Sequence, residues 1–546
     1  PSKPYYPFEG GFKNTNNFSK TLIFSSWEMV PRMISSLVSY EIERQTVGKL
    51  AKNNPELNYY NTTRKIKSKM RFESDKDKPR SMALLSMVYA SEFLTNCYDP
   101  IDCLNRNLTL KDIEKEVKSK IKEKLKIIEE KYYEKPKTNR NDYRWYYLVP
   151  LLLDSLESKA LVDEWFENVD EFIDGTRDDY HQFIKHIENL KTIFEEIYNG
   201  EDKLGKKPRD LLDVLCNLTI ASPANCIYRS YKKESHKTNK NSDLRKYAIK
   251  SSRSFITRMN YPQSIAVIEL AQKNRRDPYW KKLLKYSKQG NIQSMFDEYI
   301  HLLANGLDKN NENRIEIIHH KLLNSMQLKS ASYDYDTYQN FSSKIKEEKE
   351  KTSSLRTHFA VSFTKGKSDE SGEKRQKSVR DAFNSPFRPF VLASTSIGQE
   401  GLDFHNYCRR IVHWNLPSNP IDLEQREGRI NRFECLAIRQ NIAQRYGNIQ
   451  FEEDIWKEML NKASECEKEE GCSDLIPFWG LQNSNDMIKI ERIVPRYPFS
   501  LDEKNEYSIE YQEAQEAQQE LQKFQEYLKS LIFYPKGKIL TSVYSH

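Results

Sequence analysis

The segment best suited to chemistry in this chain is Gln425-Arg426-Glu427-Gly428-Arg429-Ile430-Asn431-Arg432. If it is helical, Arg429 and Arg432 share one face, so two guanidinium groups can point at one polyphosphate. Arginines used in this way are arginine fingers: they stabilise the charge that spreads over phosphate oxygens during phosphoryl transfer, and their loss lowers the rate by about a thousandfold. A surface helix with Arg–Glu ion pairs is the alternative interpretation of the segment taken alone.

A second polar segment, Ser394-Thr395-Ser396-Ile397-Gly398-Gln399-Glu400-Gly401-Leu402-Asp403, lies upstream and directly follows an apolar run. Gly401 lets the backbone approach a ligand closely, and the hydroxyls of Ser394 and Thr395 can bond a nucleic-acid phosphate. Asp403 can reach a ribose or the arginines. Together the two segments predict a site that handles phosphates.

Short apolar runs that alternate with helical patterns must position these segments. The runs lie at 21–24, 358–363, 390–394 and 410–414. Strands alternating with helices predict a parallel sheet covered on both faces, with ligand sites at the carboxyl ends of the strands. Ser25 and Ser26 follow the first run, so we expect them at the same edge as the phosphate-handling segments.

A long stretch of helical signals separates the first strand from the others, with Ile113, Val117, Ile121 and Leu125 at helical spacing. We therefore predict an α/β fold in which a parallel-sheet lobe is interrupted by a large all-α insertion and followed by a helical extension. The expected domains are a lead-in with the first strand and helix (1–50), the insertion (51–350), the rest of the lobe (351–450) and an extension (451–546) with a strand-like stretch at 488–494 and a helix at 508–531.

The two polar segments resemble motifs V and VI of superfamily II helicases, and the run from Leu423 to Arg429 is most similar to the Swi/Snf-like branch. The stretch from Thr21 to Trp27 looks like motif IV. The resemblance covers roughly residues 18–48 and 355–450, about a quarter of the chain. It implies that the sheet belongs to the second RecA-like lobe of such a motor.

The resemblance also implies roles for individual residues. Arg429 and Arg432 would be the catalytic arginine fingers, with Gln425, Gly401 and Asp403 as supporting ATP-binding residues. Four hydroxyl residues would touch the phosphates of one nucleic-acid strand: Ser25, Ser26, Ser394 and Thr395. Because serines at strand ends often cap helices, a capping role for Ser25 and Ser26 stays open.

The sequence departs from a complete motor in lacking a Gly-x-x-x-x-Gly-Lys-Ser/Thr loop. Gly366-Lys367-Ser368 is the nearest match, but Val361 stands where the first glycine is needed. Asp369-Glu370 does not follow an apolar strand, so it does not resemble a magnesium site. ATP and Mg²⁺ are therefore expected as cofactors held mainly by an N-terminal RecA-like lobe, in the same polypeptide or in another.

We expect the C-terminal half of an ATP-dependent helicase or translocase that acts on nucleic acid, with duplex DNA favoured by the Swi/Snf-like character. In this hypothesis the chain belongs to an enzyme but is inactive by itself. Two alternatives remain: a non-catalytic module that binds nucleic acid or protein, and a regulatory lobe that supplies its arginines in trans to a separate ATPase.

Positive charge is concentrated in one stretch, where ten basic residues stand against Glu234 and Asp243. Such density is expected of a phosphate-backbone contact, and equally of a solvated lysine-rich loop. The basic residues of this stretch are Arg229, Lys232, Lys233, Lys237, Lys240, Arg245, Lys246, Lys250, Arg253 and Arg258.

Composition adds expectations about location and metals. We find no run of about 18 uncharged apolar residues, so no membrane association is expected. The eight cysteines contain no Cys-x-x-Cys pair, which favours a reducing cytoplasm and argues against a zinc ribbon. The N-terminus resembles a linker, so the chain is expected to begin within a longer protein. His319-His320 diverge on a helix, and no metal is predicted.

Overall fold

A computed structural model describes most of the chain. The described residues are 3–13, 18–52, 66–75, 78–135, 139–168, 178–235, 239–274, 276–328, 332–335, 353–363, 370–395, 402–467, 475–482, 487–495 and 540–541.

A five-stranded parallel sheet forms the core of the α/β part, in the strand order β10-β8-β1-β7-β6. Leu22 and Phe24 of the central strand point to one face of the sheet and are buried there. The predicted fold class is confirmed. The strands are β1 (Lys20–Ser25), β6 (Ala360–Phe363), β7 (Val391–Thr395), β8 (Cys408–His413) and β10 (Glu491–Ile493).

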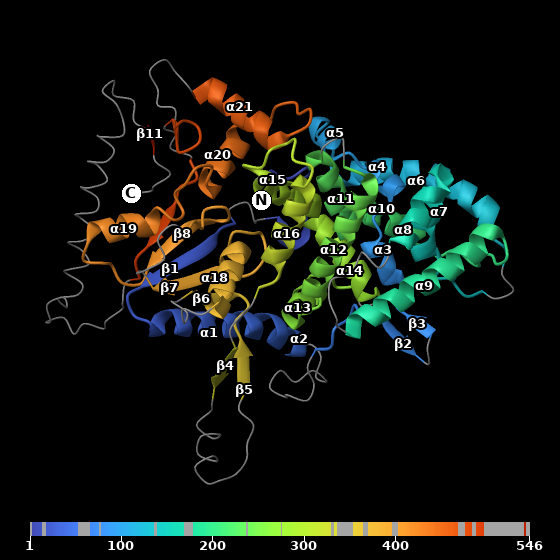
Figure 1. Cartoon of the computed structure of the whole chain (residues 1–546), viewed down its shortest axis with the longest axis horizontal. Helices are drawn as coiled ribbons and strands as arrows, with labels where there is room; N and C mark the ends of the chain where they lie inside the picture. The colour runs from blue at the N-terminus through green and yellow to red at the C-terminus, as the bar shows by residue number, and fades with distance from the viewer. Residues whose placement is uncertain are drawn as a thin grey trace, which may run out of the picture.

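Helices pack on this sheet from several parts of the chain. Helix α1 (Met29–Glu43) contacts β6 and β7, α18 (Glu370–Phe383) contacts β6, and α20 (Leu436–Tyr446) contacts β8. Figure 1 shows this part beside a larger helical block, with α1 running below the sheet. Helix α19 (Pro420–Glu427) follows β8 and is capped by Asn419, whose side chain accepts from the Ile421 amide.

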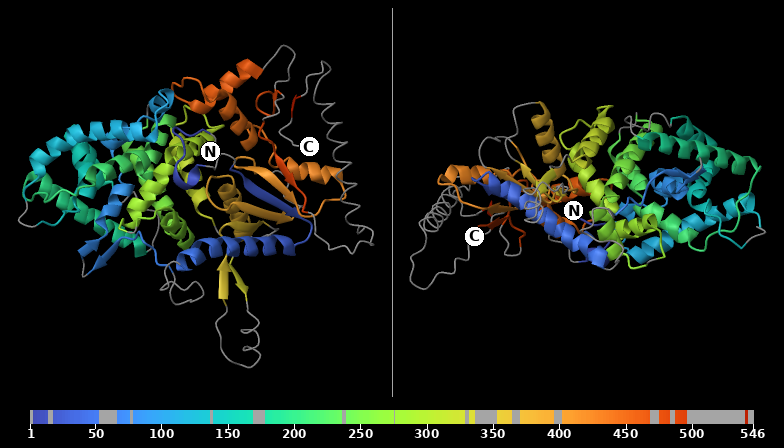
Figure 2. Two further views of the ribbon diagram at one scale, coloured as in Figure 1. Left: turned by 180° about the vertical axis from the view of Figure 1, so that it is seen from behind. Right: turned by 90° about the horizontal axis from the view of Figure 1, so that it is seen from below.

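The helical block lies between β1 and β6 in the chain and stands to one side of the sheet in all three ribbon views (Figures 1 and 2). It is not purely helical, because β2 (Glu73–Asp75) and β3 (Lys78–Arg80) pair antiparallel; a second antiparallel pair, β4 (Ser332–Tyr335) and β5 (Ser353–Arg356), lies below α1 in Figure 1. Its helices are α2 (Lys49–Lys52), α3 (Leu85–Val88), α4 (Glu92–Asn96), α5 (Pro100–Asn105), α6 (Leu110–Tyr132), α7 (Trp145–Glu157), α8 (Lys159–Glu167), α9 (Asp178–Asn199), α10 (Leu211–Ala221), α11 (Pro223–Glu234), α12 (Asn241–Met259), α13 (Pro262–Ala271), α14 (Tyr279–Gln289), α15 (Ile292–Ala304) and α16 (Arg314–Met326).

Amphipathic spacing accounts for the longest helix of the block. In α6 the residues Ile113, Val117, Ile121 and Leu125 are buried, and Thr109 and Asp112 form a capping box at its start. Within the described residues, one helical stretch, 211–234, is long and apolar enough to cross a bilayer, but 89% of its apolar window is buried inside the protein. These helices therefore serve as core elements of the block.

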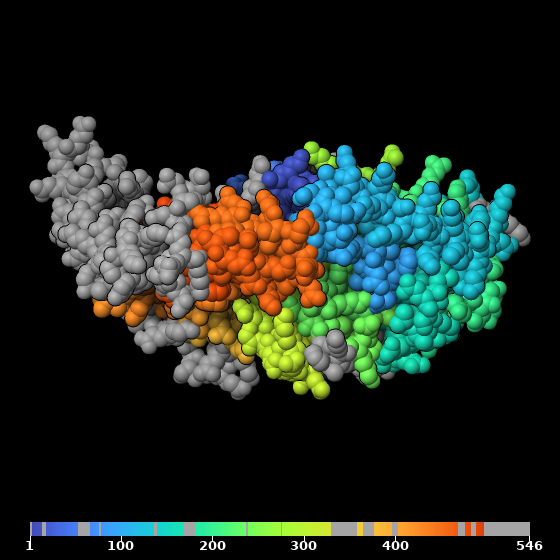
Figure 3. All heavy atoms as spheres, turned by 90° about the horizontal axis from the view of Figure 1, so that it is seen from above, coloured from blue at the N-terminus to red at the C-terminus, as the bar shows by residue number. Residues whose placement is uncertain are grey.

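The segment after the sheet contacts the helical block again. Helix α21 (Ile455–Glu467) packs against α20, and the Asn105 side chain donates to the Phe451 carbonyl at 2.7 Å and accepts from the Phe451 amide at 2.9 Å. Figure 3 shows residues of this segment adjoining those of the α5–α6 region on one face. A short pair, β9 (Leu481–Gln482) and β11 (Leu540–Thr541), follows, while the helix expected at 508–531 lies outside the described residues.

Candidate functional site

The two phosphate-handling segments meet at the carboxyl ends of β1, β7 and β8. Trp414, just after β8, donates from its amide to the Phe24 carbonyl at 2.8 Å. The guanidinium carbons of Arg426 and Arg429 each lie 5.5 Å from the centre of the Phe24 ring. The structure therefore brings segments that are far apart in the sequence to one edge of the sheet.

Arg432 and Asp403 form the most accessible ion pair of this edge. The Arg432 Nε donates to the Asp403 Oδ1 at 2.7 Å, and the two side chains are 39% and 46% exposed. The Asp403 carbonyl accepts from the Asn384 side chain at 2.6 Å, which fixes the backbone there. A partly exposed guanidinium held in place by a carboxylate can bind an incoming phosphate without a large reorganisation.

Arg429 and Arg432 do not lie on a helix, contrary to the geometry expected from their spacing. Helix α19 ends at Glu427; Arg429 lies in the turn at 428–430 that follows, and Arg432 lies just beyond this turn. Gly428 is a poor helix former, and the buried Ile430 draws the turn toward the core. Arg429 is consequently 7% exposed beside Phe24, whereas the side chain of Arg432 is 39% exposed.

Two of the three proposed ATP-binding residues, Gln425 and Asp403, lie within the described part of the chain. Gln425 is exposed on α19, and Asp403 pairs with Arg432 as described above. Gly401 lies outside the described residues, as does the rejected loop candidate Gly366-Lys367-Ser368.

The four hydroxyl residues divide into buried and accessible ones. Ser25 and Ser394 are each about 1% exposed; the Ser25 hydroxyl accepts from the Trp27 amide, and the Ser394 hydroxyl donates to the Phe363 carbonyl at 2.8 Å. These two therefore serve local structure. Ser26 is exposed and accepts from the Asn415 side chain at 2.6 Å, and Thr395, which ends β7, is half-buried.

A buried ionic group beneath the edge was not predicted. Glu427 lies 3.4 Å from His413 and accepts from Arg492 of β10 at 2.6 Å, and Arg426 donates to the Asn415 carbonyl at 3.0 Å. Burial lowers the pKa of His413, and the neighbouring Glu427 opposes this. Because these groups support the turn that carries Arg429, they position the site. The only sequence signal was the charge of Arg426 and Glu427 inside the octapeptide.

The basic stretch combines buried arginines with partly exposed and exposed lysines. Arg229, Arg245 and Arg258 are each less than 10% exposed. Lys232 pairs with Glu92, and Lys233 donates to Asp297 at 2.8 Å. Much of its charge therefore holds helices together and is not presented to a phosphate backbone.

A comparison with protein families bears directly on this lobe. Residues 336–434 match the model described as Helicase conserved C-terminal domain. This match supports a helicase C-terminal lobe for the α/β part. The matched range includes β6, β7, β8 and the segment that carries the two arginines. Searches of curated proteins and of solved structures gave no match.

The sheet also contains two strands outside the matched range, β1 and β10. β1 lies in the middle of the sheet, between β8 and β7, although it precedes the match in the sequence. Its register pairs Leu22 with Leu392 on one side and with Ile411 on the other. The central strand of the sheet is therefore supplied by a segment that precedes the helical block in the sequence.

Proposed function

We propose that this chain is the C-terminal half of an ATP-dependent translocase or helicase that acts on duplex DNA, in the manner of the Swi/Snf-like branch. Arg432 and Arg429 act as its arginine fingers, and an N-terminal RecA-like lobe supplies the phosphate loop and the Mg²⁺ ligands. The observation that carries the proposal is the accessible Arg432–Asp403 pair at the carboxyl edge of a helicase C-terminal lobe.

The different side-chain partners of Arg432 and Arg429 support different roles for the two arginines. Arg432 is oriented by Asp403 and faces outward, so it reaches the γ-phosphate when the lobes close. Arg429 is held against Phe24 and contributes once closure removes water. Ser26 and Thr395 contact one strand of the duplex through its phosphates. The proposed domain boundaries at 50, 350 and 450 place all of these residues in one lobe.

The seven described cysteines are unbridged, which supports a reducing compartment and a cytoplasmic protein. Within this proposal the helical block has a structural role beside the motor, because three arginines of its basic stretch are buried and two of its lysines pair with carboxylates.

The test is ATP hydrolysis by the complete open reading frame that encodes this chain, measured with duplex DNA, single-stranded DNA and RNA. We expect duplex DNA to stimulate turnover at least tenfold. Absence of hydrolysis with every nucleic acid would contradict the proposal. Hydrolysis that appears only when a separate ATPase chain is added would support action in trans.

A further inference from the structure

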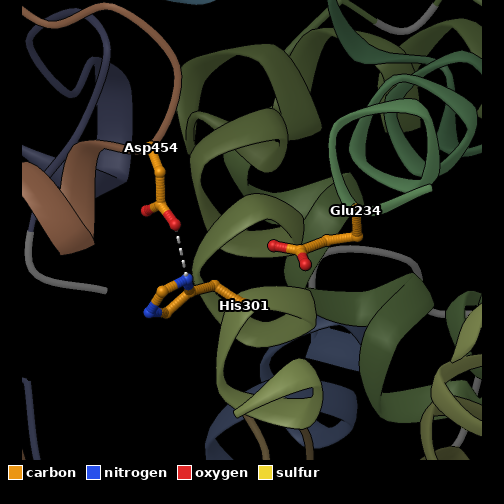
Figure 4. A group of neighbouring side chains, drawn as sticks. All are labelled: Glu234, His301 and Asp454. Carbon is orange, nitrogen blue, oxygen red and sulfur yellow. Dashed lines mark ion pairs between the residues drawn. The ribbon is translucent and has the colours of Figure 1, made fainter. Parts of the chain in front are cut away.

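Three potential metal ligands converge from separate elements far from the carboxyl edge. Glu234 ends α11, His301 lies in the last turn of α15, and Asp454 immediately precedes α21. One ligand atom from each residue lies within 4.8 Å of the others. Figure 4 shows the three side chains pointing toward a common space.

The spacing of these atoms fits a tetrahedral ion. Ligand atoms sit about 2.0–2.2 Å from Zn²⁺, so two of them on one ion are roughly 3.4 Å apart. The His301 Nδ1 and the Asp454 Oδ2 are already 3.5 Å apart. A small movement of the Glu234 side chain brings a third ligand to the same centre, and water completes the coordination.

The rest of the structure holds both carboxylates by one oxygen. The Asp454 Oδ1 accepts from the amides of Trp456 and Lys457, each at 3.1 Å, while its Oδ2 faces His301. The Glu234 Oε2 accepts from the buried Arg314 at 2.6 Å. Carboxylates that bind metals are commonly oriented by such outer hydrogen bonds.

Access and ligand type favour a transition-metal ion. The side chains of His301, Asp454 and Glu234 are 22%, 29% and 16% exposed, so an ion can enter from solvent without unfolding. Two separate ion pairs, His301 with Asp454 and Arg314 with Glu234, are the alternative explanation of this cluster. Imidazole suits Zn²⁺ and related ions, whereas Mg²⁺ prefers an all-oxygen set.

We propose that Glu234, His301 and Asp454 form a Zn²⁺-type binding site that joins the segment after the sheet to the helical block. Because α11 and α15 belong to the block and Asp454 starts the turn into α21, one ion would cross-link two parts of the chain that are distant in sequence. The site lies outside the proposed ATPase machinery, so the proposal of a metal site does not depend on the proposed function.

The experiment uses the complete, tag-free chain, freed of metal by a chelator and titrated with ZnCl₂ against a chromophoric zinc indicator. The parent protein and all variants derived from it carry Cys466→Ser, because Cys466 is an exposed thiol that can bind zinc. We expect one equivalent of zinc to bind and to raise the melting temperature. Excess MgCl₂ should not displace it. His301→Ala and Asp454→Asn should each weaken zinc binding by about a hundredfold or more.

His320→Ala is the matched control, because His320 is 62% exposed on α16 and outside the cluster; it should bind zinc like the parent. Since His301→Ala also breaks the pair with Asp454, the readout is the zinc-induced change within each variant. Glu234→Gln supplies an independent variant if another fails to fold. The proposal is overturned if the parent shows no saturable zinc binding, or if zinc binds the His301→Ala and Asp454→Asn chains as it binds the parent.

Discussion

Replacing Asp154 by alanine should destabilise the helical block more than any surface substitution. Asp154 of α7 is fully buried and accepts five hydrogen bonds, two from side-chain hydroxyls, two from amides at the start of α4 and one from Arg245 of α12. Without the carboxylate, Arg245 remains as a buried charge that is only 4% exposed. Removing one partner of a buried ion pair costs about 3–5 kcal/mol.

The assay is urea unfolding followed by circular dichroism, which reports mainly on helices. With a slope of about 3 kcal/mol per molar urea, a loss of this size lowers the unfolding midpoint by about 1 M or more. Asp163→Ala is the matched control: it removes a carboxylate that pairs with Lys159 at the surface, and its cost should stay below about 1 kcal/mol. Equal shifts of the urea midpoint for the two variants would refute the assignment of Asp154 as a residue that stabilises the block through its buried hydrogen bonds.

Two further predictions concern the lobe. Burial, followed by the positive charge of Arg439, lowers the pKa of His405 to about 4. Between pH 6.5 and pH 4 the unfolded chain therefore binds a proton that the folded chain excludes, so stability is complete above pH 6.5 and falls by at most about 3 kcal/mol as the pH falls through this window. Unfolding measured across this range should show a shallower pH dependence for His405→Gln, and identical slopes would contradict the reasoning. Thr395→Val should weaken binding to duplex DNA several-fold in a fluorescence titration. Ser394→Ala should leave the affinity unchanged, because the Ser394 hydroxyl donates to the Phe363 carbonyl inside the protein. A loss of affinity in Ser394→Ala but not in Thr395→Val would contradict this assignment.

The sheet was predictable because its strands are continuous apolar runs. The runs at 21–24, 358–363, 390–394 and 410–414 correspond to β1, β6, β7 and β8. The parallel topology alone predicted that segments 394–403 and 425–432 would lie at the same edge of the sheet. Sequence spacing failed within the octapeptide itself, where Gly428 and the buried Ile430 override the helical arrangement that would align Arg429 with Arg432.

The sequence did not predict contacts between side chains that are far apart in the chain. A count of charges does not show which way side chains point, so Arg245 looked like surface charge until its partner Asp154, on another helix, was seen. The ligands Glu234, His301 and Asp454 come from three separate segments, and no local spacing links them. Such groups become visible only when the fold places them together.

The most direct measurement of the central claim compares ATP turnover by the complete protein with that of its Arg432→Ala variant, at saturating ATP and duplex DNA. Arg380→Ala serves as the control, because Arg380 is a partly exposed arginine on α18 that pairs with Asp381. The account predicts that kcat falls about a thousandfold in Arg432→Ala while DNA affinity and Arg380→Ala turnover are retained. Turnover by Arg432→Ala equal to that of the wild type would contradict it.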